Sequence, residues 1–441
     1  MFSRKELTRL IVPLVIEQLL AVTIGIADTI MVASCGEAAV SGVSLVDSIN
    51  ILLINIFSAL ATGGAIVSSQ YIGRDDRENA SVSAKTLIYA SALLALLIGV
   101  FCLILRGPLL HLIFGDVEAE VMANSQTYFW LSALSYPFLA VYNAGAALFR
   151  TMGNSKISML TSILMNLVNL GGNALLIYGF QMGVAGAATA TLISRILGAV
   201  LITILLLRQQ GIIQIDRLFY PEFRPDMLKK ILQIGVPNGL ESGMFQIGKI
   251  LVQSLVASFG TAAIAANAVA GNIAGIPLIP GNAVGLAMIT VVGQCVGAQN
   301  YPEAKKYTLK LTGLTYAAMG ALEILLLLIL NPVLSIYQLQ PETAELARVI
   351  LVYHSIVSIF IWPGAFVLPN GLRAAGDVKF TMLVSVFSMW VFRIALSYVI
   401  AQWMNWGVFG VWVAMTIDWV VRIIFFGVRF FNGKWQNRQI I

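Results

Sequence analysis

Long apolar segments alternate along the chain with short polar or charged connections. Between the charged positions, apolar runs occur near residues 10–34, 43–70, 86–105, 125–148, 157–180, 184–207, 232–258, 268–295, 310–330, 346–372, 380–400 and 407–430. Many of these runs reach the roughly 20 residues that a helix needs to cross about 30 Å of hydrocarbon. The pattern therefore predicts an all-α integral membrane protein with twelve transmembrane helices.

The composition strengthens this prediction. Of the 441 residues, 59% are hydrophobic and 11% are charged, whereas about a quarter of an ordinary soluble domain is charged. A soluble enzyme is thereby excluded, and we expect no catalytic residues. Cys35, Cys102 and Cys295 have neither the spacing of a disulfide framework nor that of a metal site, so we expect no cofactor. The apolar run after the charged N-terminus is too long for a signal peptide, which indicates an uncleaved first span.

The basic residues predict the orientation. With the N-terminus in the cytoplasm, only Arg106 and Arg348 of the 27 Lys and Arg residues lie outside, and three lie within spans. This asymmetry predicts cytoplasmic N- and C-termini and a location in the cytoplasmic membrane. Because the positive charges are scattered over short connections, we expect no nucleic-acid partner. The expected surroundings are the lipid bilayer, and the expected state is a monomer.

The two halves of the chain are related by an internal repeat. A shift of 224 positions aligns Val12-Pro13 with Val236-Pro237, and it likewise aligns Glu17 with Glu241 and Gln70 with Gln294. We therefore predict an N-terminal lobe at 1–207, a cytoplasmic linker at 208–231 and a C-terminal lobe at 232–441. Six spans in each lobe give both the same orientation, with a pseudo-twofold axis along the membrane normal and a central cleft. Such parallel repeats suit alternating access.

Ionisable residues inside spans are the main functional candidates, because each costs several kcal/mol unless it is compensated. Asp28 lies in the middle of the first span and has no basic neighbour along the helix. Asn166, Asn169 and Asn173 share one face of the fifth span, and Thr191 lies on the sixth. Carboxylate, amide and hydroxyl oxygens are the ligands that a small dehydrated cation needs. Interhelical hydrogen bonding is the alternative role for the asparagines and the threonine.

The C-terminal half carries different charges, since Val252 stands at the position equivalent to Asp28. Glu241 and Lys249 lie on the seventh span with Gln246 between them. We expect Glu241 to meet a cationic substrate in the cleft and Lys249 to neutralise it when the cleft is empty; permanent pairing with neighbours is an equal alternative. Glu17 lies on nearly the same face as Asp28 and is a further candidate for the cleft. Tyr142 and Phe245 are candidate aromatic walls for organic cations.

Several motifs resemble those of the MATE family, the multidrug and toxic compound extrusion transporters. They are ADTIMVASCG around Asp28, SQYIGRDDRENA, FRTMGNSK, NLVNLGGNALLIYG, and GVAGAATAT closing on Thr191. The resemblance implies a twelve-span fold with a V-shaped cleft, cation-driven efflux, and a cation site at Asp28, Asn169, Asn173 and Thr191. Two positions depart from the family pattern: Asn173 stands where some members carry a second acid, and Phe245 stands where another branch has a glutamate.

These observations predict a secondary active antiporter. It would export multiple drugs or other small organic compounds, which are expected to be cationic or amphipathic. In exchange, Na⁺ or H⁺ would enter through the site centred on Asp28. The alternative is a flippase or exporter of an amphipathic lipid-linked or peptide substrate. That activity would require a more basic cleft for phosphate, whereas only Lys249 and Arg393 are candidates here.

Overall fold

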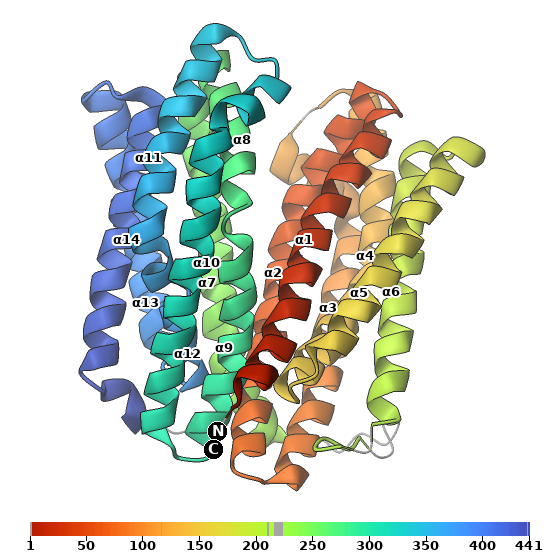
Figure 1. The fold of residues 1–441 in the computed structure, drawn as a ribbon. Coiled ribbons are helices and arrows are strands. Elements are labelled where there is room, and N and C mark those ends of the chain that lie inside the picture. The colour runs from red at the N-terminus through yellow and green to blue at the C-terminus, as the bar shows by residue number, and fades with distance from the viewer. Residues whose placement is uncertain (1, 116, 210, 216–223, 439) are drawn as a thin grey trace. The chain divides into compact units, whose positions relative to one another are not determined.

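The computed structural model describes residues 2–115, 117–209, 211–215, 224–438 and 440–441. These residues are almost entirely helical, and no strand occurs among them (Figure 1). Their packing divides them into an N-terminal unit, residues 2–239, and a C-terminal unit, residues 240–440. Part of the predicted linker, residues 210 and 216–223, lies outside the described residues.

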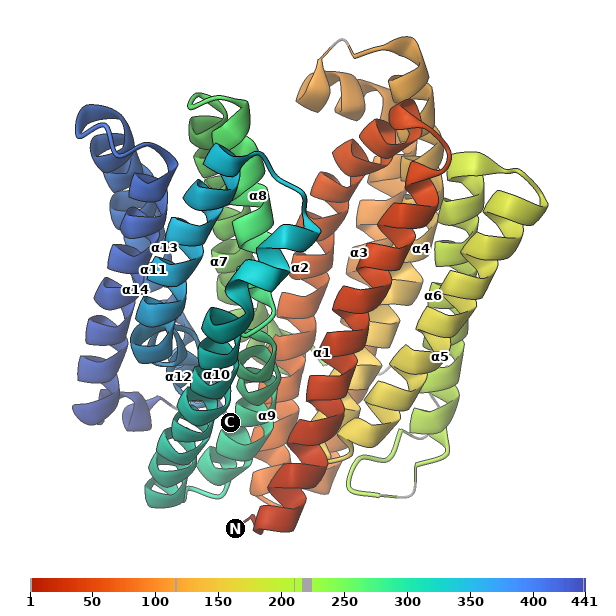
Figure 2. The same cartoon turned by 45° about the horizontal axis from the view of Figure 1, so that its top comes forward.

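The N-terminal unit contains six long helices and one π-helical turn. They are α1 (Arg4–Ala33), α2 (Glu37–Gly73), α3 (Arg77–Phe114), α4 (Ala119–Thr151), α5 (Ser155–Asn173), η1 (Ala174–Gly179) and α6 (Gly183–Leu207). Helix α4 is central, because it packs extensively against α2, α3 and α6. Helix α1 lies beside α5 at the edge of this bundle (Figures 1 and 2).

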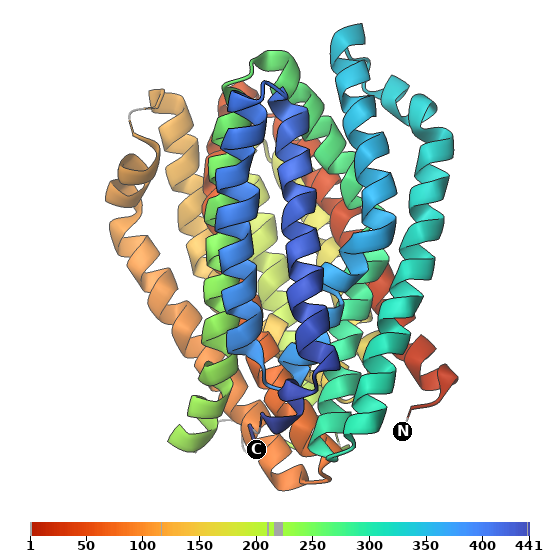
Figure 3. The same ribbon diagram turned by 90° about the vertical axis from the view of Figure 1, so that its left-hand side faces the viewer.

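The C-terminal unit repeats this arrangement with more interruptions. Its elements are α7 (Pro225–Ala257), α8 (Thr261–Gly275), α9 (Ile279–Gly297), α10 (Tyr301–Ile336), α11 (Pro341–Phe366), α12 (Leu368–Ala374), α13 (Val378–Ser388), η2 (Met389–Ala395), η3 (Tyr398–Trp403), α14 (Gly407–Phe431) and η4 (Lys434–Asn437). Helix α14 packs along the segment from α13 to η3 (Figure 3).

Helix α7 begins in the N-terminal unit and ends in the C-terminal unit. The division falls between Gly239 and Leu240, whereas the sequence places the beginning of the C-terminal lobe at residue 232. The reason is close packing against α2: a Cβ added at Gly63 would lie 2.7 Å from the carbonyl oxygen of Ile231. The first part of α7 therefore belongs with α2.

Among the described residues, ten helical segments are long and apolar enough to cross a membrane. Their exposed faces carry large apolar side chains, such as Leu93, Leu97 and Ile104 on α3, which are 59%, 61% and 72% exposed. These faces suit lipid. Helices α4 and α7 are long but more polar, and α8 has only 15 residues. The count of twelve spans stays a prediction.

The expected single span 268–295 is divided into α8 and α9. The break lies at residues 276–278 and contains Pro277, while Pro280 lies in the first turn of α9. A proline lacks the backbone N–H, and its ring clashes with the preceding turn, so two prolines this close stop one helix and begin another. The apolar run conceals this break.

The internal repeat is visible in the backbone. Gly36 and Gly260 precede α2 and α8 with φ angles of 105° and 95°, a region that favours glycine. Asp76 caps α3 by accepting from the Asn79 amide at 3.0 Å, and Asn300 caps α10 in the same way. The π-helical turn η1 recurs 224 positions later as η3. The halves thus share local geometry as well as sequence.

Equivalent glycines also make close helix contacts in both halves. A Cβ added at Gly186 of α6 would lie 3.0 Å from the Leu176 backbone, and one at Gly410 of α14 would lie 3.0 Å from the Ala401 backbone. Backbone cannot yield as a flexible side chain can. Small residues at these crossings therefore allow the close approach on which membrane helices depend.

We predict that Gly410→Val destabilises the protein by about 1–3 kcal/mol, because the larger side chain forces α14 away from η3. Gly427→Val is the matched control, since a Cβ at Gly427 of the same helix meets no atom within 4 Å. Melting temperatures of the purified variants in detergent measure the difference. Equal melting temperatures for the two variants would contradict the proposed helix contact.

Candidate functional site

The residues expected to bind a cation lie together in the N-terminal unit. Asp28 extends from α1, Asn169 and Asn173 from α5, and Thr191 from α6. The Asn173 amide nitrogen donates to Asp28 Oδ1 at 2.7 Å. The spacing of the asparagines along α5 brings both amides to the face that meets α1, as the sequence predicts.

Asn169 connects Asp28 with Thr191. When its amide nitrogen faces the carboxylate, it donates to both Asp28 oxygens, at 2.9 and 3.0 Å, and its own oxygen accepts from the Thr191 hydroxyl at 3.0 Å. The opposite orientation would place three acceptor oxygens against each other, so the hydrogen-bond network decides this assignment. An ionised Asp28 is thereby surrounded by N–H donors.

These residues line a cavity of about 330 Å³, here called the acidic pocket. It is enclosed by helices α1, α2, α4, α5 and α6. Its lining consists of Gly25, Asp28, Thr29, Val32, Val40, Val43, Ser44, Asp47, Tyr128, Met165, Asn166, Asn169, Asn173, Ala187, Thr191, Ser194 and Arg195.

Sequence reasoning missed a second acid in this pocket, Asp47 of α2. Its carboxylate accepts from the Asn50 amide at 3.1 Å and interacts with the Tyr128 hydroxyl. Arg195 is the basic residue of the lining, and its guanidinium donates to Ser135 at 2.7 Å. The position of Asp47, just inside the expected second span, and the polar Asn50 one turn later were the available signals. Two acids against one base favour a cationic occupant.

No ion pair within 4 Å is recorded for Asp28 in the described part of the chain. The Asn173 oxygen Oδ1 is also buried without a hydrogen-bond partner there. A free acceptor beside an uncompensated carboxylate is what a hard cation would use. The described residues contain no cluster of three His, Cys, Asp or Glu side chains, so a site for a softer metal is not formed by them.

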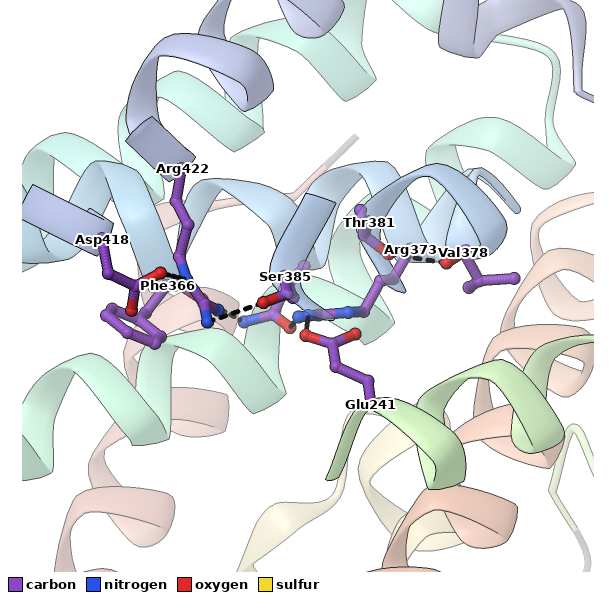
Figure 4. Close-up of polar contacts among 9 residues, drawn as sticks. Glu241, Phe366, Arg373, Val378, Thr381, Ser385, Asp418 and Arg422 are labelled. Carbon is purple, nitrogen blue, oxygen red and sulfur yellow. Dashed lines mark hydrogen bonds and ion pairs between the residues drawn. The ribbon is translucent and has the colours of Figure 1, made fainter. Parts of the chain in front are cut away.

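Glu17 and Glu241, both expected in the cleft, are instead paired with arginines. Arg150 lies 3.8 Å from Glu17, which also accepts from the Ser158 hydroxyl at 3.0 Å. Arg373 donates to Glu241 at 2.6 Å (Figure 4). Arg373, and not Lys249, is thus the partner of Glu241, which agrees with the alternative of pairing with a neighbour. A neighbouring helix supplies a bidentate-capable guanidinium, which is a better partner for a carboxylate.

The two ion pairs occupy equivalent positions in the repeat. Glu17 and Glu241 are 224 residues apart, and Arg150 and Arg373 are 223 apart. Each pair joins the first helix of its half to the last turn of a later helix, α4 for Arg150 and α12 for Arg373. This recurrence indicates a structural role common to both halves.

The remaining candidates are divided between the interior and a second cavity. Tyr142 is buried in the N-terminal unit and does not line the acidic pocket. Phe245 and Lys249 line a cavity of the C-terminal unit, and Gln246 does not. Asp418 pairs with Arg422 at 2.8 Å on α14, and Arg422 also donates to the Ser385 carbonyl (Figure 4).

We predict that Glu241→Gln and Arg373→Gln each lower the melting temperature. Each variant leaves the other member of the pair as a charge without its partner, and both side chains are only about a sixth exposed. The double variant should lose less than the sum, with a coupling free energy of about 0.5–3 kcal/mol. The exposed pair Glu345 and Arg348 is the control and should show about 0–1 kcal/mol. Additive effects at Glu241 and Arg373 would refute the coupling.

Comparison with known proteins identifies the family. The model of the MatE family matches the chain twice, at residues 13–175 and 237–399. The two matches are offset by the same 224 residues as the internal repeat. Together they cover well over half of the chain.

Curated relatives and solved structures agree with this match. An uncharacterized transporter, YisQ of Bacillus subtilis, is 26% identical over 97% of this chain and 92% of its own length. A probable multidrug resistance protein NorM of Thermotoga maritima is 24% identical, with 99% and 94% covered. A crystal structure of a MATE protein in the bent conformation has a TM-score of 0.88 at 20% identity, with 97% and 96% covered. The helical fold, the duplicated match and the full-length likeness show that this chain belongs to the MATE family of membrane transporters and is not an enzyme.

Proposed function

We propose that this protein exports small organic compounds in exchange for Na⁺ or H⁺, which enters through the acidic pocket. Two observations support the proposal. Relatives that match nearly the whole chain are named multidrug resistance proteins. The acidic pocket contains the Asp28 carboxylate. Among the described residues, amides donate to this carboxylate, and no ion pair with a basic residue is recorded for it.

The environment of Asp28 carries the argument. A carboxylate within a membrane helix is costly when ionised, unless it is paired, hydrated or occupied by a cation. Hydrogen bonds from Asn169 and Asn173 stabilise the charge only in part, because neutral donors leave the net charge in place. A proton or a monovalent cation would remove the remaining cost. Binding of a cation to Asp28 is therefore favourable, whereas a carboxylate in a permanent ion pair would gain little from it.

The amides can adapt to both states of the site. Each carboxamide has a donating and an accepting end, so rotation about its last bond exchanges N–H for C=O. In the state described here the nitrogens face Asp28. With a cation bound, the oxygens of Asn169 and Asn173 would turn toward it, together with the Thr191 hydroxyl. Occupation of the pocket thus changes the contacts that join α1 to α5 and α6.

This change is the basis of the proposed coupling. A bound cation shifts the transporter only by the difference in its affinity for two conformations. Contacts between α1 and α5 differ with occupancy, so ion binding favours one position of α1. Pro13 lies inside α1 and removes one backbone hydrogen bond, which eases bending of this helix. Substrate release then accompanies the conformation that the ion favours.

Orientation and substrate complete the proposal. We place the protein in the cytoplasmic membrane with both termini in the cytoplasm, as the asymmetry of basic residues indicates. The acids expected to receive an organic cation, Glu17 and Glu241, already have arginine partners. The proposal therefore covers small organic compounds and does not require them to be cations.

We predict that Asp28→Asn reduces gradient-driven efflux by about tenfold or more, because an amide cannot bind a proton or balance a cation. Proteoliposomes with imposed Na⁺ or pH gradients and a panel of fluorescent dyes, including ethidium, measure the rate. Dye exchange without a gradient should persist in the variant, which separates coupling from folding.

Glu345→Gln, the same chemical change at an exposed position, is the control and should behave as the wild type. The ion whose gradient drives efflux in the wild type identifies the coupling ion. Wild-type efflux by Asp28→Asn under both gradients would refute the role of the acidic pocket.

A further inference from the structure

The C-terminal unit contains a larger cavity, here called the basic pocket, of about 550 Å³. This volume lies in the range of sites for drug-sized ligands. Its walls come from α7, α8, α9, α11, α14 and η2. They consist of Phe245, Lys249, Val252, Gln253, Asn267, Gly271, Ala274, Gly275, Leu278, Asn282, His354, Trp362, Phe366, Arg393, Val411, Trp412, Met415 and Trp419.

The charges of this lining are all positive. Lys249 and Arg393 face the cavity, and no Asp or Glu is among the residues that line it. Within the part of the chain that the structure describes, no hydrogen bond or ion pair is recorded for Lys249. The polarity is thus opposite to that of the acidic pocket.

The acid nearest to Arg393 is Asp418, whose Oδ1 accepts from Arg422 and whose Oδ2 is buried without a hydrogen-bond partner in the described structure. Asp418 lies 3.9 Å from the Arg393 guanidinium, beyond hydrogen-bonding distance, and 2.8 Å from Arg422. It also accepts from the Ser388 hydroxyl at 2.5 Å. One carboxylate is therefore shared between two arginines, and the charge of Arg393 remains partly uncompensated although its side chain is only 12% exposed.

The two positive charges lie beside the same aromatic ring. The Lys249 ammonium is 5.3 Å and the Arg393 guanidinium 5.2 Å from the centre of the Phe245 ring. Attraction to the ring compensates each cation in part. Their mutual repulsion remains, and burial among apolar side chains strengthens it. An anion bound in the cavity that both residues line would relieve both costs.

Further groups are available to hold such a ligand. The Trp419 indole nitrogen and the His354 Nδ1 are buried without a hydrogen-bond partner in the described structure. Trp362 and Phe366 form a stacked wall, with ring centres 5.0 Å apart. Flat aromatic surfaces favour a flat apolar body, while the cations and the free indole N–H favour an acidic group.

We propose that the basic pocket binds an organic anion with a flat aromatic body, such as an aromatic carboxylate or sulfonate. Export of compounds of this class rests on the proposed function, whereas their binding does not. The same acidic chemistry occurs on anionic lipid headgroups. A soluble compound fits better, because the cavity has the size of a single drug-like molecule and its walls are aromatic.

The test is equilibrium binding of 2-naphthalenesulfonate to the purified protein in nanodiscs of neutral lipid, with the naphthyltrimethylammonium cation as the matched probe. We expect the sulfonate to bind at least about tenfold more tightly than the cation. Lys249→Gln and Arg393→Gln should each weaken sulfonate binding about tenfold. Arg393→Lys, which keeps the charge, should retain most of it and excludes a folding defect as the cause.

Arg348→Gln, on the exposed face of α11, is the control and should bind the sulfonate like the wild type. Asp28→Asn should also bind it normally, so that loss of coupled efflux and loss of anion binding are separate results. Equal or tighter binding of the cation, or unchanged sulfonate binding in the Lys249→Gln/Arg393→Gln double variant, would overturn the proposal.

Lipid is tested in a separate arm. Nanodiscs that contain phosphatidylglycerol should leave sulfonate affinity within about twofold of that in neutral lipid. Displacement of the sulfonate by phosphatidylglycerol in the wild type would assign the pocket to a lipid headgroup and overturn the proposal for a soluble compound.

Discussion

Each charge buried in a membrane protein costs several kcal/mol unless a neighbour compensates it, and this cost governs the interior of both units. Most ionised groups here meet a partner on another helix or one turn away, as Glu241 does with Arg373 and Asp418 with Arg422. Asp28 and Lys249 do not have a recorded ion pair among the described residues. Asp28 and Lys249 face cavities, whereas Glu241 and Arg373 join two helices.

Duplication of one half explains why the paired charges occupy equivalent positions in the two units and the unpaired charges do not. The structural ion pairs, the helix caps and the close glycine contacts recur at equivalent positions, because both halves need the same packing. The two cavities also recur, because many of their lining positions are 224 residues apart, but the charges that line them differ. Asp28 has Val252 as its counterpart, and Val252 lines the basic pocket. The two halves thus keep a common framework and have acquired pockets of opposite polarity.

The sequence was informative wherever one helix determines the geometry. The spacing of Asn169 and Asn173 predicts that both amides share a face, and the structure places both beside Asp28. Their role in ion binding stays a prediction. The membrane class and the family were also accessible, because apolar length and motif spelling are local properties.

Contacts between distant helices were not accessible in the same way. The partner of Glu241 is 132 residues away, and nothing local distinguishes Arg373 from Lys249 as the nearer base. Asp47 was overlooked because it lies near the end of an apolar run, where charges usually mark the membrane surface. The break at Pro277 was hidden by side chains that are apolar on both sides of it. In each case tertiary packing supplied the missing information.

The shallow burial of α1 has a mechanical consequence. In the most apolar stretch of α1, only 17% is buried inside the protein, whereas 78% of the corresponding stretch of α9 is buried. A helix with so few internal contacts is held weakly by packing, whereas α9 is held firmly. Asp28 lies on this helix, so under the proposed coupling a bound cation acts on a weakly packed element. The least buried of the ten apolar helical segments therefore also carries the carboxylate of the acidic pocket.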